Sequence, residues 1–307
     1  MKKRKPAARS RSKLRLIPVG LILALGLSLH SCADIPAKPI EAAGNALEKL
    51  ARDLEKAVGQ SSSAPGSATK PSVPSAARAG NTNGDFSACP QFFAGGTPPV
   101  VAPQLMQRAL CYDAFAILHS GESKTAVYVA QRLNRALVAD ADEERTNQFY
   151  AEARLRSAER ATLADYQGSG FDRGHLAPAG QMPTPAAMAQ SFSLANMVPQ
   201  APKHNRGAWK TSVEAATKKY AARASGDVYV ITGPVYAPSI AQSKGIGPGQ
   251  VRMPTYLFKL VYDEDRHKAW AHWHLNDNAT RASAPITYGE LVRRTGIEFL
   301  PGIRLQD

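Results

Sequence analysis

Cysteine, long apolar runs and internal repeats are all scarce in this chain. Only three of its 307 residues are cysteine, and no second thiol or histidine stands at zinc-ligand spacing from those in the body of the chain, which disfavours a structural zinc module. The apolar stretch over residues 16–29 is shorter than the roughly 20 residues that a transmembrane helix needs. Residues 59–85 have almost no large apolar side chains, which excludes them from a core.

The N-terminus is basic. The first 31 residues carry eight basic side chains and no acidic one, so they account for +8 of the formal net charge of +13. The remaining +5 suits an anionic partner such as nucleic acid without proving one. A basic start followed by a short apolar stretch is typical of a signal peptide, which we predict for residues 1–31.

Cys32 stands at the end of this predicted signal. Leu29-His30-Ser31-Cys32 looks like a bacterial lipoprotein box in which His30 is atypical, so lipidation of Cys32 and simple export both stay open. An uncleaved signal would also leave the rest of the chain outside the cytoplasm, because the basic flank stays inside. We therefore expect an exported protein that is periplasmic, tethered to the outer membrane through Cys32, or extracellular.

The rest of the chain divides into a spacer, residues 32–85, and a globular domain, residues 86–307. Apolar residues at spacings of three and four over residues 40–58 predict a short amphipathic helix. Residues 59–85, rich in Ser, Ala, Gly and Pro, then form a flexible linker. Large apolar residues reappear after it, and a core can begin there.

Two cysteines remain in the predicted domain, Cys89 and Cys111. In an oxidising compartment they form a natural disulfide pair, and two buried thiols are the alternative. Export favours the disulfide, which we predict.

Apolar and polar patterns in the domain predict an α+β fold with a central antiparallel sheet. Strands are expected over residues 127–129, 228–232, 256–262 and 268–274, and helices over residues 206–222 and 287–294. The pattern over residues 143–163 does not distinguish helix from irregular chain.

The segment Asp172-Arg173-Gly174-His175, with Asn205 further along, contains the side chains needed to hydrolyse a phosphodiester. His175 suits the role of general base, because an unperturbed pKa of about 6.5 leaves its neutral form abundant near pH 7. Arg173 suits phosphate binding, because its planar guanidinium binds two oxygens and keeps its charge. Each residue also has an ordinary reading: a turn histidine, a surface arginine and a helix-capping asparagine.

Asn205 is a neutral oxygen donor for a metal ion. An amide oxygen adds no negative charge, so the ion stays a strong Lewis acid and does not repel the phosphate. Mg²⁺ keeps several waters and needs few protein ligands, so we expect Mg²⁺ as the cofactor, with Mn²⁺ as a substitute.

Four segments resemble, in order, the motifs of the DNA/RNA non-specific endonucleases. They are Ser169-Gly170-Phe171-Asp172-Arg173-Gly174-His175-Leu176-Ala177-Pro178-Ala179, residues 191–200, Asn205 with Trp209 and Glu214, and Val228-Tyr229-Val230-Ile231-Thr232-Gly233-Pro234. The resemblance covers roughly residues 86–303. It implies the ββα-metal (His-Me finger) nuclease fold, in which helices flank a central antiparallel sheet.

The resemblance implies an Mg²⁺-dependent endonuclease that cleaves DNA and RNA by contacting the phosphate backbone. His175 would be the general base, Asn205 the direct metal ligand and Arg173 a phosphate contact. Products would carry 5′-phosphates. The oligomeric state stays open.

The outer part of the site matches less closely. Asn196 would hold the histidine or the substrate by hydrogen bonds, and Glu214 would orient water on the metal. Glu214 stands five positions after Trp209, where the resemblance predicts about four, and Lys218 takes the place of a cation that follows the glutamate by one helical turn. Arg145, on a looser match, would stabilise the transition state.

Three other functions stay open. His272 and His274 lie two apart on an expected strand, hence on one face, as in a zinc hydrolase. An exported nucleic-acid receptor or uptake protein could keep the fold without the reaction. A phosphodiesterase acting on small molecules could use the same residues.

Overall fold

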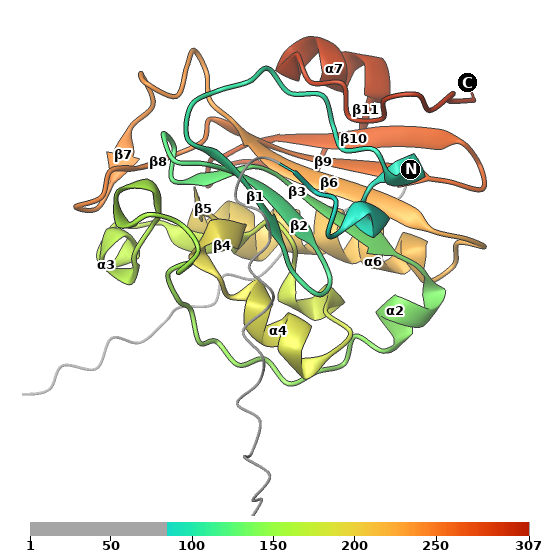
Figure 1. Ribbon diagram of the computed structural model, residues 1–307, viewed down its shortest axis with the longest axis horizontal. Helices are drawn as coiled ribbons and strands as arrows, with labels where there is room; N and C mark the ends of the chain where they lie inside the picture. Colours follow the sequence, from blue (N-terminus) through green and yellow to red (C-terminus); the bar gives the residue numbers. More distant parts are fainter. Residues whose placement is uncertain (1–84, 307) are drawn as a thin grey trace, which may run out of the picture. The chain divides into compact units, whose positions relative to one another are not determined.

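The computed structural model describes residues 85–306 (Figure 1). The predicted signal peptide, Cys32, the amphipathic helix and the linker lie outside the described residues, so those features stay predictions. None of the helices within 85–306 has the length and apolar character needed to cross a membrane.

A sheet of seven antiparallel strands runs through the described part of the chain, in the order β1-β2-β3-β6-β9-β10-β11. The strands are β1 (Gln107–Cys111), β2 (Ala116–Ser120), β3 (Thr125–Leu133), β6 (Val228–Val235), β9 (Tyr256–Asp263), β10 (Lys268–Leu275) and β11 (Ile286–Thr287). The predicted α+β fold with a central antiparallel sheet is confirmed. Each of the four predicted strands lies within a longer strand, whereas β1 and β2 were not predicted.

The sheet separates two layers of core, because alternate side chains of a strand point to opposite faces. On β9, Phe258 and Leu260 pack on one face together with residues of the N-terminal segment, such as Phe93. Helix α7 (Tyr288–Thr295) also covers this face and lies above the sheet in Figure 1. This helix was predicted from the sequence. Thr287 is its N-cap residue, and the Thr287 side chain accepts a hydrogen bond from the backbone N–H of Glu290.

The opposite face carries the layer that contains the motif. Two short antiparallel strands, β4 (Asp172–His175) and β5 (Met197–Gln200), lead into one long helical segment. That segment consists of α5 (Pro202–His204), η6 (Asn205–Glu214), which is wound as a π-helix with a kink at Gly207, and α6 (Ala215–Ala221). Helices α4 and α6 lie below the sheet in Figure 1, and Trp209 and Phe192 are fully buried against it.

The segments between these elements are short or irregular. The remaining helices are α2 (Arg135–Ala139), α3 (Leu163–Tyr166) and α4 (Pro185–Ser191), with 3₁₀ turns η1 (Pro90–Phe92), η2 (Ala94–Gly96), η3 (Ser157–Glu159), η4 (Ala179–Gln181) and η5 (Leu194–Asn196). Strands β7 (Gly245–Ile246) and β8 (Val251–Arg252) form a separate hairpin. The ambiguous segment 143–163 has little regular structure and is fixed by side chains: Glu152, for example, accepts from Arg154 and from Tyr112.

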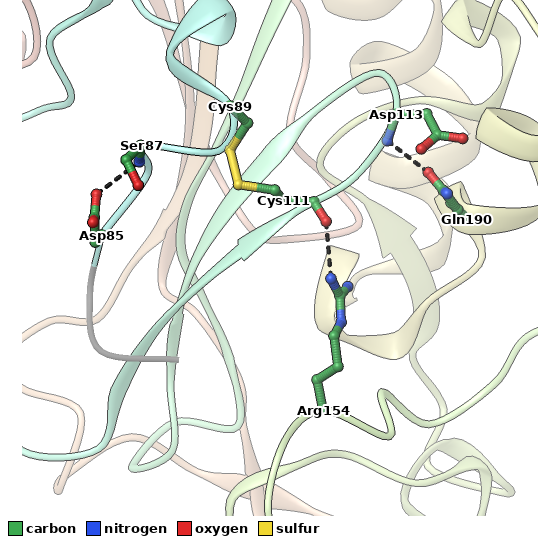
Figure 2. Close-up of a disulfide and its surroundings, with 7 residues drawn as sticks. All are labelled: Asp85, Ser87, Cys89, Cys111, Asp113, Arg154 and Gln190. Carbon is green, nitrogen blue, oxygen red and sulfur yellow. Dashed lines mark hydrogen bonds between the residues drawn. A yellow bond between two sulfur atoms is a disulfide. The ribbon is translucent and has the colours of Figure 1, made fainter. Parts of the chain in front are cut away.

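A disulfide joins the N-terminal segment to the edge of the sheet (Figure 2). Cys89 and Cys111 are bonded, with 5.8 Å between their Cα atoms, so the predicted pairing is confirmed. The carbonyl oxygen of Cys111 also accepts a hydrogen bond from Arg154 at 2.8 Å, as Figure 2 shows. The bond therefore attaches residues of one core layer to the edge strand β1.

Candidate active site

The β4–β5 pair sets the direction of the motif. Asp172 lies opposite Gln200 and His175 opposite Met197. Gly174 is required between them, because a Cβ at this position would lie 2.1 Å from the Oε1 atom of Gln200. The glycine of the motif therefore permits close contact between the two strands.

A cavity of about 1000 Å³ opens beside β4 and the helical segment. It brings together five of the six residues predicted for the site, from three separate parts of the chain: Arg145, Arg173, His175, Asn205 and Glu214. Further cations at its wall are Arg206, Lys210 and Lys218, and an apolar side contains Leu163, Tyr166 and Phe171. The cavity is therefore cationic where the motif lies.

His175 is held as a neutral imidazole. Its side chain is only 8% exposed and packs against the rings of Phe149 and Phe192, at centroid distances of 5.9 and 5.2 Å. Burial lowers the pKa of His175 to about 3, and the nearby charges of Arg145 and Arg173 act in the same direction. Its buried Nε2 has no hydrogen-bond partner among the described residues. A neutral imidazole at the edge of a cationic cavity can accept a proton near pH 7.

Two arginines are positioned by aromatic rings. The guanidinium of Arg173 lies over Phe149, 4.0 Å from the ring centroid, and that of Arg145 lies over Phe192 at 5.0 Å. Stacking fixes the plane of a guanidinium while leaving its in-plane N–H groups available to phosphate oxygens. Although Arg145 had only a loose match in the sequence, the fold places it in the same cavity as Arg173.

Asp172 orients the predicted metal ligand. The Nδ2 atom of Asn205 donates to Asp172 Oδ2 at 2.9 Å, which leaves Asn205 Oδ1 available as a donor to a metal. Arg206 forms two hydrogen bonds to the same carboxylate, at 2.8 and 2.5 Å. In the sequence, Asp172 stands out only as part of the motif. Its proximity to Asn205 comes from the pairing of β4 with β5 and the turn into the helix.

Asn205 and Glu214 lie at the two ends of η6 and both line the cavity. The bond at the end of η6 runs from Ala215 N–H to Lys210 O, five residues back, as in a π-helix. Gly207, between the two residues, has non-helical backbone angles and kinks the segment.

Glu214 lies among cations. Burial raises the pKa of its carboxyl, whereas Lys259, Lys210 and Arg145 lower it. Lys218, expected as a cation near this glutamate, instead donates to two backbone oxygens, Gly180 O at 2.6 Å and Ala141 O at 2.9 Å. Lys218 therefore joins two loops at the cavity wall.

Asn196 lies outside the cavity and contacts the backbone. Its Nδ2 donates to the carbonyl oxygens of Ala177 and Ser191, and its Oδ1 accepts from Ala177 N, each at 2.9 Å. The side chain is fully buried. In this geometry Asn196 holds the chain that follows His175, and the predicted hydrogen bond to the histidine or to the substrate stays a prediction.

The donor set fits one hard divalent cation. Asn205 offers a neutral amide oxygen, and the carboxylate of Glu214 lies at the same cavity. Across residues 85–306, no group of three or more His, Cys, Asp or Glu side chains is arranged to hold a metal ion. A site with so few protein ligands suits Mg²⁺, which retains most of its waters.

One of the two histidines proposed for zinc, His274, is hydrogen-bonded instead. Gln200 Nε2 lies 3.3 Å from His204 Nδ1, and His204 Nε2 lies 3.1 Å from His274 Nδ1. Because the glutamine amide nitrogen can only donate, His204 donates onward to His274, and this bond uses the Nδ1 lone pair of His274. In the described part of the chain His272 and His274 gain no third ligand, so the zinc-hydrolase alternative is wrong.

Comparisons with known proteins agree with this geometry. A family model of DNA/RNA non-specific endonucleases matches residues 97–306. Nuclease C1 of Cunninghamella echinulata var. echinulata is 31% identical over 210 residues, which cover 64% of this chain and 81% of that protein. Mitochondrial endonuclease G of Bos taurus is 32% identical over 270 residues, which cover 81% of this chain and 79% of that protein.

A solved structure has the same fold. The crystal structure of the EndoG/EndoGI complex, which describes how EndoG is inhibited, matches with a TM-score of 0.57 and 27% identity, over 64% of this chain and 86% of that chain. Together with the match of the family model and the likeness to endonuclease G, it shows that this chain belongs to the DNA/RNA non-specific endonuclease family.

Proposed function

We propose that this chain is an Mg²⁺-dependent endonuclease that hydrolyses phosphodiester bonds of both DNA and RNA. The observation that carries the proposal is the meeting of His175, Arg173 and Asn205 at one cavity. A protein that only binds nucleic acid needs the cations, but it needs neither a buried neutral base nor an oriented amide oxygen.

His175 performs the proton transfer. Its imidazole removes a proton from the attacking water, whose oxygen forms the new bond to phosphorus as the bond to the leaving 3′-oxygen breaks. The leaving oxygen takes a proton from water. The lowered pKa of His175 keeps the imidazole unprotonated near pH 7. The same shift weakens its attraction for the proton, which the negative charge of a bound phosphate would offset. Arg173 and Arg145 hold the non-bridging oxygens and stabilise the charge that grows on them in the transition state.

Asn205 would hold the metal ion, with Asp172 fixing its amide. Mg²⁺, when bound, supplies positive charge close to the phosphoryl and leaving oxygens. Glu214 would accept hydrogen bonds from water at this place and so orient it. Mn²⁺, which takes the same oxygen donors, is the expected substitute.

The substrate would be bound through its backbone. Arginine and lysine at the cavity wall contact phosphates, and such contacts carry no base sequence. We therefore expect little base preference and cleavage of both DNA and RNA. The resemblance to the family implies products with 5′-phosphates. The likeness to proteins named as nucleases supports nucleic acid over small phosphodiesters as the substrate.

We also propose export. The basic and apolar start of the chain and the Cys89–Cys111 bond support it, because disulfides persist in oxidising compartments. The curated relatives include mitochondrial nucleases, so compartment requires its own test. When the full chain is expressed in a bacterial host, it should appear in the periplasmic or membrane fraction. If Cys32 is lipidated, the chain should also incorporate labelled palmitate, and the Cys32→Ser variant should not. A chain confined to the cytoplasm contradicts export.

The activity test uses the purified full chain with supercoiled plasmid, single-stranded RNA and bis-p-nitrophenyl phosphate. With Mg²⁺ we expect cleavage of plasmid and RNA and none with EDTA. Tight DNA binding without cleavage in Mg²⁺ or Mn²⁺ would instead favour the receptor. Turnover of the small diester alone would favour a small-molecule phosphodiesterase.

A further inference from the structure

A lysine is buried in the sheet directly behind the active site. Lys259 lies in the middle of β9, opposite Thr232 of β6 and His272 of β10. Its side chain has no exposed surface and reaches toward β4. An ammonium group is costly to bury, so a lysine in this place needs strong pairing or a function.

The ammonium holds the peptide that follows the general base. Lys259 Nζ donates to Leu176 O at 3.3 Å and to Thr232 Oγ1 at 2.6 Å. On its other side, Leu176 N–H donates to Asn196 O at 3.0 Å. Both polar groups of the residue next to His175 are therefore fixed, which limits how far the imidazole can move.

Glu214 is the acidic group whose charge acts on this lysine, although no ion pair joins the two side chains among the described residues. The acceptors found within the described residues are neutral oxygens, and they use two of the three N–H groups of Lys259. Burial lowers the pKa of Lys259 to about 8, and Glu214 acts in the opposite direction. Burial raises the pKa of the Glu214 carboxyl. The positive charge of Lys259 lowers it, as do those of Lys210 and Arg145.

We propose that Lys259 is a positioning residue of the active site. Its buried ammonium fixes the peptide after His175 and, from behind the cavity, places positive charge near Glu214. Lys259 is not among the residues that line the cavity, so it acts through His175 and Glu214, which do. The inference rests on the proposed endonuclease function and adds to it a residue 83 positions from Leu176, on another element.

The test compares Lys259→Met with the wild-type full chain in plasmid cleavage at saturating Mg²⁺. We expect kcat to fall at least tenfold while KM stays within twofold, because the residue contacts no substrate. The melting temperature should fall, because methionine leaves Leu176 O and Thr232 Oγ1 without this donor. A lysine with a merely structural role would lower the melting temperature in the same way but leave kcat unchanged at temperatures where the variant is folded.

Lys219→Met is the matched control, since it removes the same charge from an exposed position on α6. It should leave kcat unchanged, and an equal loss in both variants would overturn the inference. If Lys259→Met does not fold, Lys259→Gln replaces it, since glutamine keeps an N–H donor without the charge. Wild-type kcat in either folded variant also overturns the inference.

A double-mutant cycle with Glu214→Gln tests the coupling of the two side chains. If Lys259 acts partly through Glu214, the double variant loses less kcat than the product of the two single losses. Fully multiplicative losses would contradict action through Glu214. Failure of the proposed function is distinct from failure of this inference, because in the first case the wild-type chain itself would not cleave.

Discussion

Asp172 should set the affinity of the site for its metal ion. Its carboxylate accepts from Asn205 Nδ2, so it determines which end of the amide faces the cavity. In Asp172→Ala the amide can rotate, and Asn205 then presents a mixture of oxygen and N–H groups. Fewer molecules hold the ligand oxygen in place, so a higher Mg²⁺ concentration is needed for half-maximal cleavage.

The size of the effect follows from the hydrogen bond that is lost. A hydrogen bond to a charged group contributes about 1.5–3 kcal/mol, or roughly 10- to 150-fold in an equilibrium constant. The Asp172 side chain is 15% exposed, which favours the lower part of this range. We expect the half-maximal Mg²⁺ concentration to rise about 10- to 30-fold, in line with the effects of groups that orient metal ligands.

The assay is the initial rate of plasmid cleavage as Mg²⁺ is titrated. Arg206→Ala is the matched control, because Arg206 bonds the same carboxylate but its side chain is 73% exposed, where an ion pair contributes little. That variant should change the Mg²⁺ requirement less than twofold. Asp172→Asn keeps a neutral acceptor for Asn205 and should lie between the two. A wild-type Mg²⁺ curve in Asp172→Ala would refute the assignment of Asn205 as the oriented ligand.

Three further predictions concern binding and stability. Phe149→Leu removes the ring beneath Arg173, a contact of about 0.5–1 kcal/mol, so KM should rise about two- to fivefold while Phe149→Tyr retains wild-type KM. The Cys89→Ser, Cys111→Ser variant opens a loop with a sequence separation of 22, so its free energy of unfolding in urea should be lower by about 3 kcal/mol, with kcat unchanged. An unaltered urea midpoint would contradict the stabilising role of the disulfide. Burial lowers the pKa of three histidines to about 4: His119, His204 and His272. Each folded pKa lies below the unfolded value of about 6.5, so the contribution of each neutral histidine to the free energy of unfolding is fully present above pH 6.5. It falls toward pH 4 by up to about 1.4 kcal/mol per pH unit for each group. Equal urea midpoints at pH 7 and pH 5 would argue against neutral buried imidazoles.

The sequence predicted the parts of the site that are close together along the chain. Asp172 to His175 and Asn205 can be recognised as a motif because the chemistry needs those residue types, and β4 and the following helix keep them close in space. The sheet was predicted where strands are buried and apolar, as in residues 228–232. Strands β1 and β2 were missed, because Arg108 and His119 interrupt their apolar pattern.

Other features depend on contacts between distant segments. Lys259 left a signal in the sequence, a single lysine inside the apolar strand Tyr256-Leu257-Phe258-Lys259-Leu260-Val261-Tyr262, but its partners Leu176 and Glu214 come from other elements. The bonds of Asn196 to the backbone of Ala177 could not be predicted, because they join segments that are 19 residues apart. The π-helical turns likewise have no sequence period of their own.

His175 as the general base is the central claim, and chemical rescue tests it most directly. The measurement is the initial rate of plasmid cleavage by His175→Ala at saturating Mg²⁺, with and without added imidazole. We expect a loss of at least a hundredfold and a partial return of activity that rises with the concentration of neutral imidazole, which can enter through the cavity. Cleavage by His175→Ala at the wild-type rate would contradict the account.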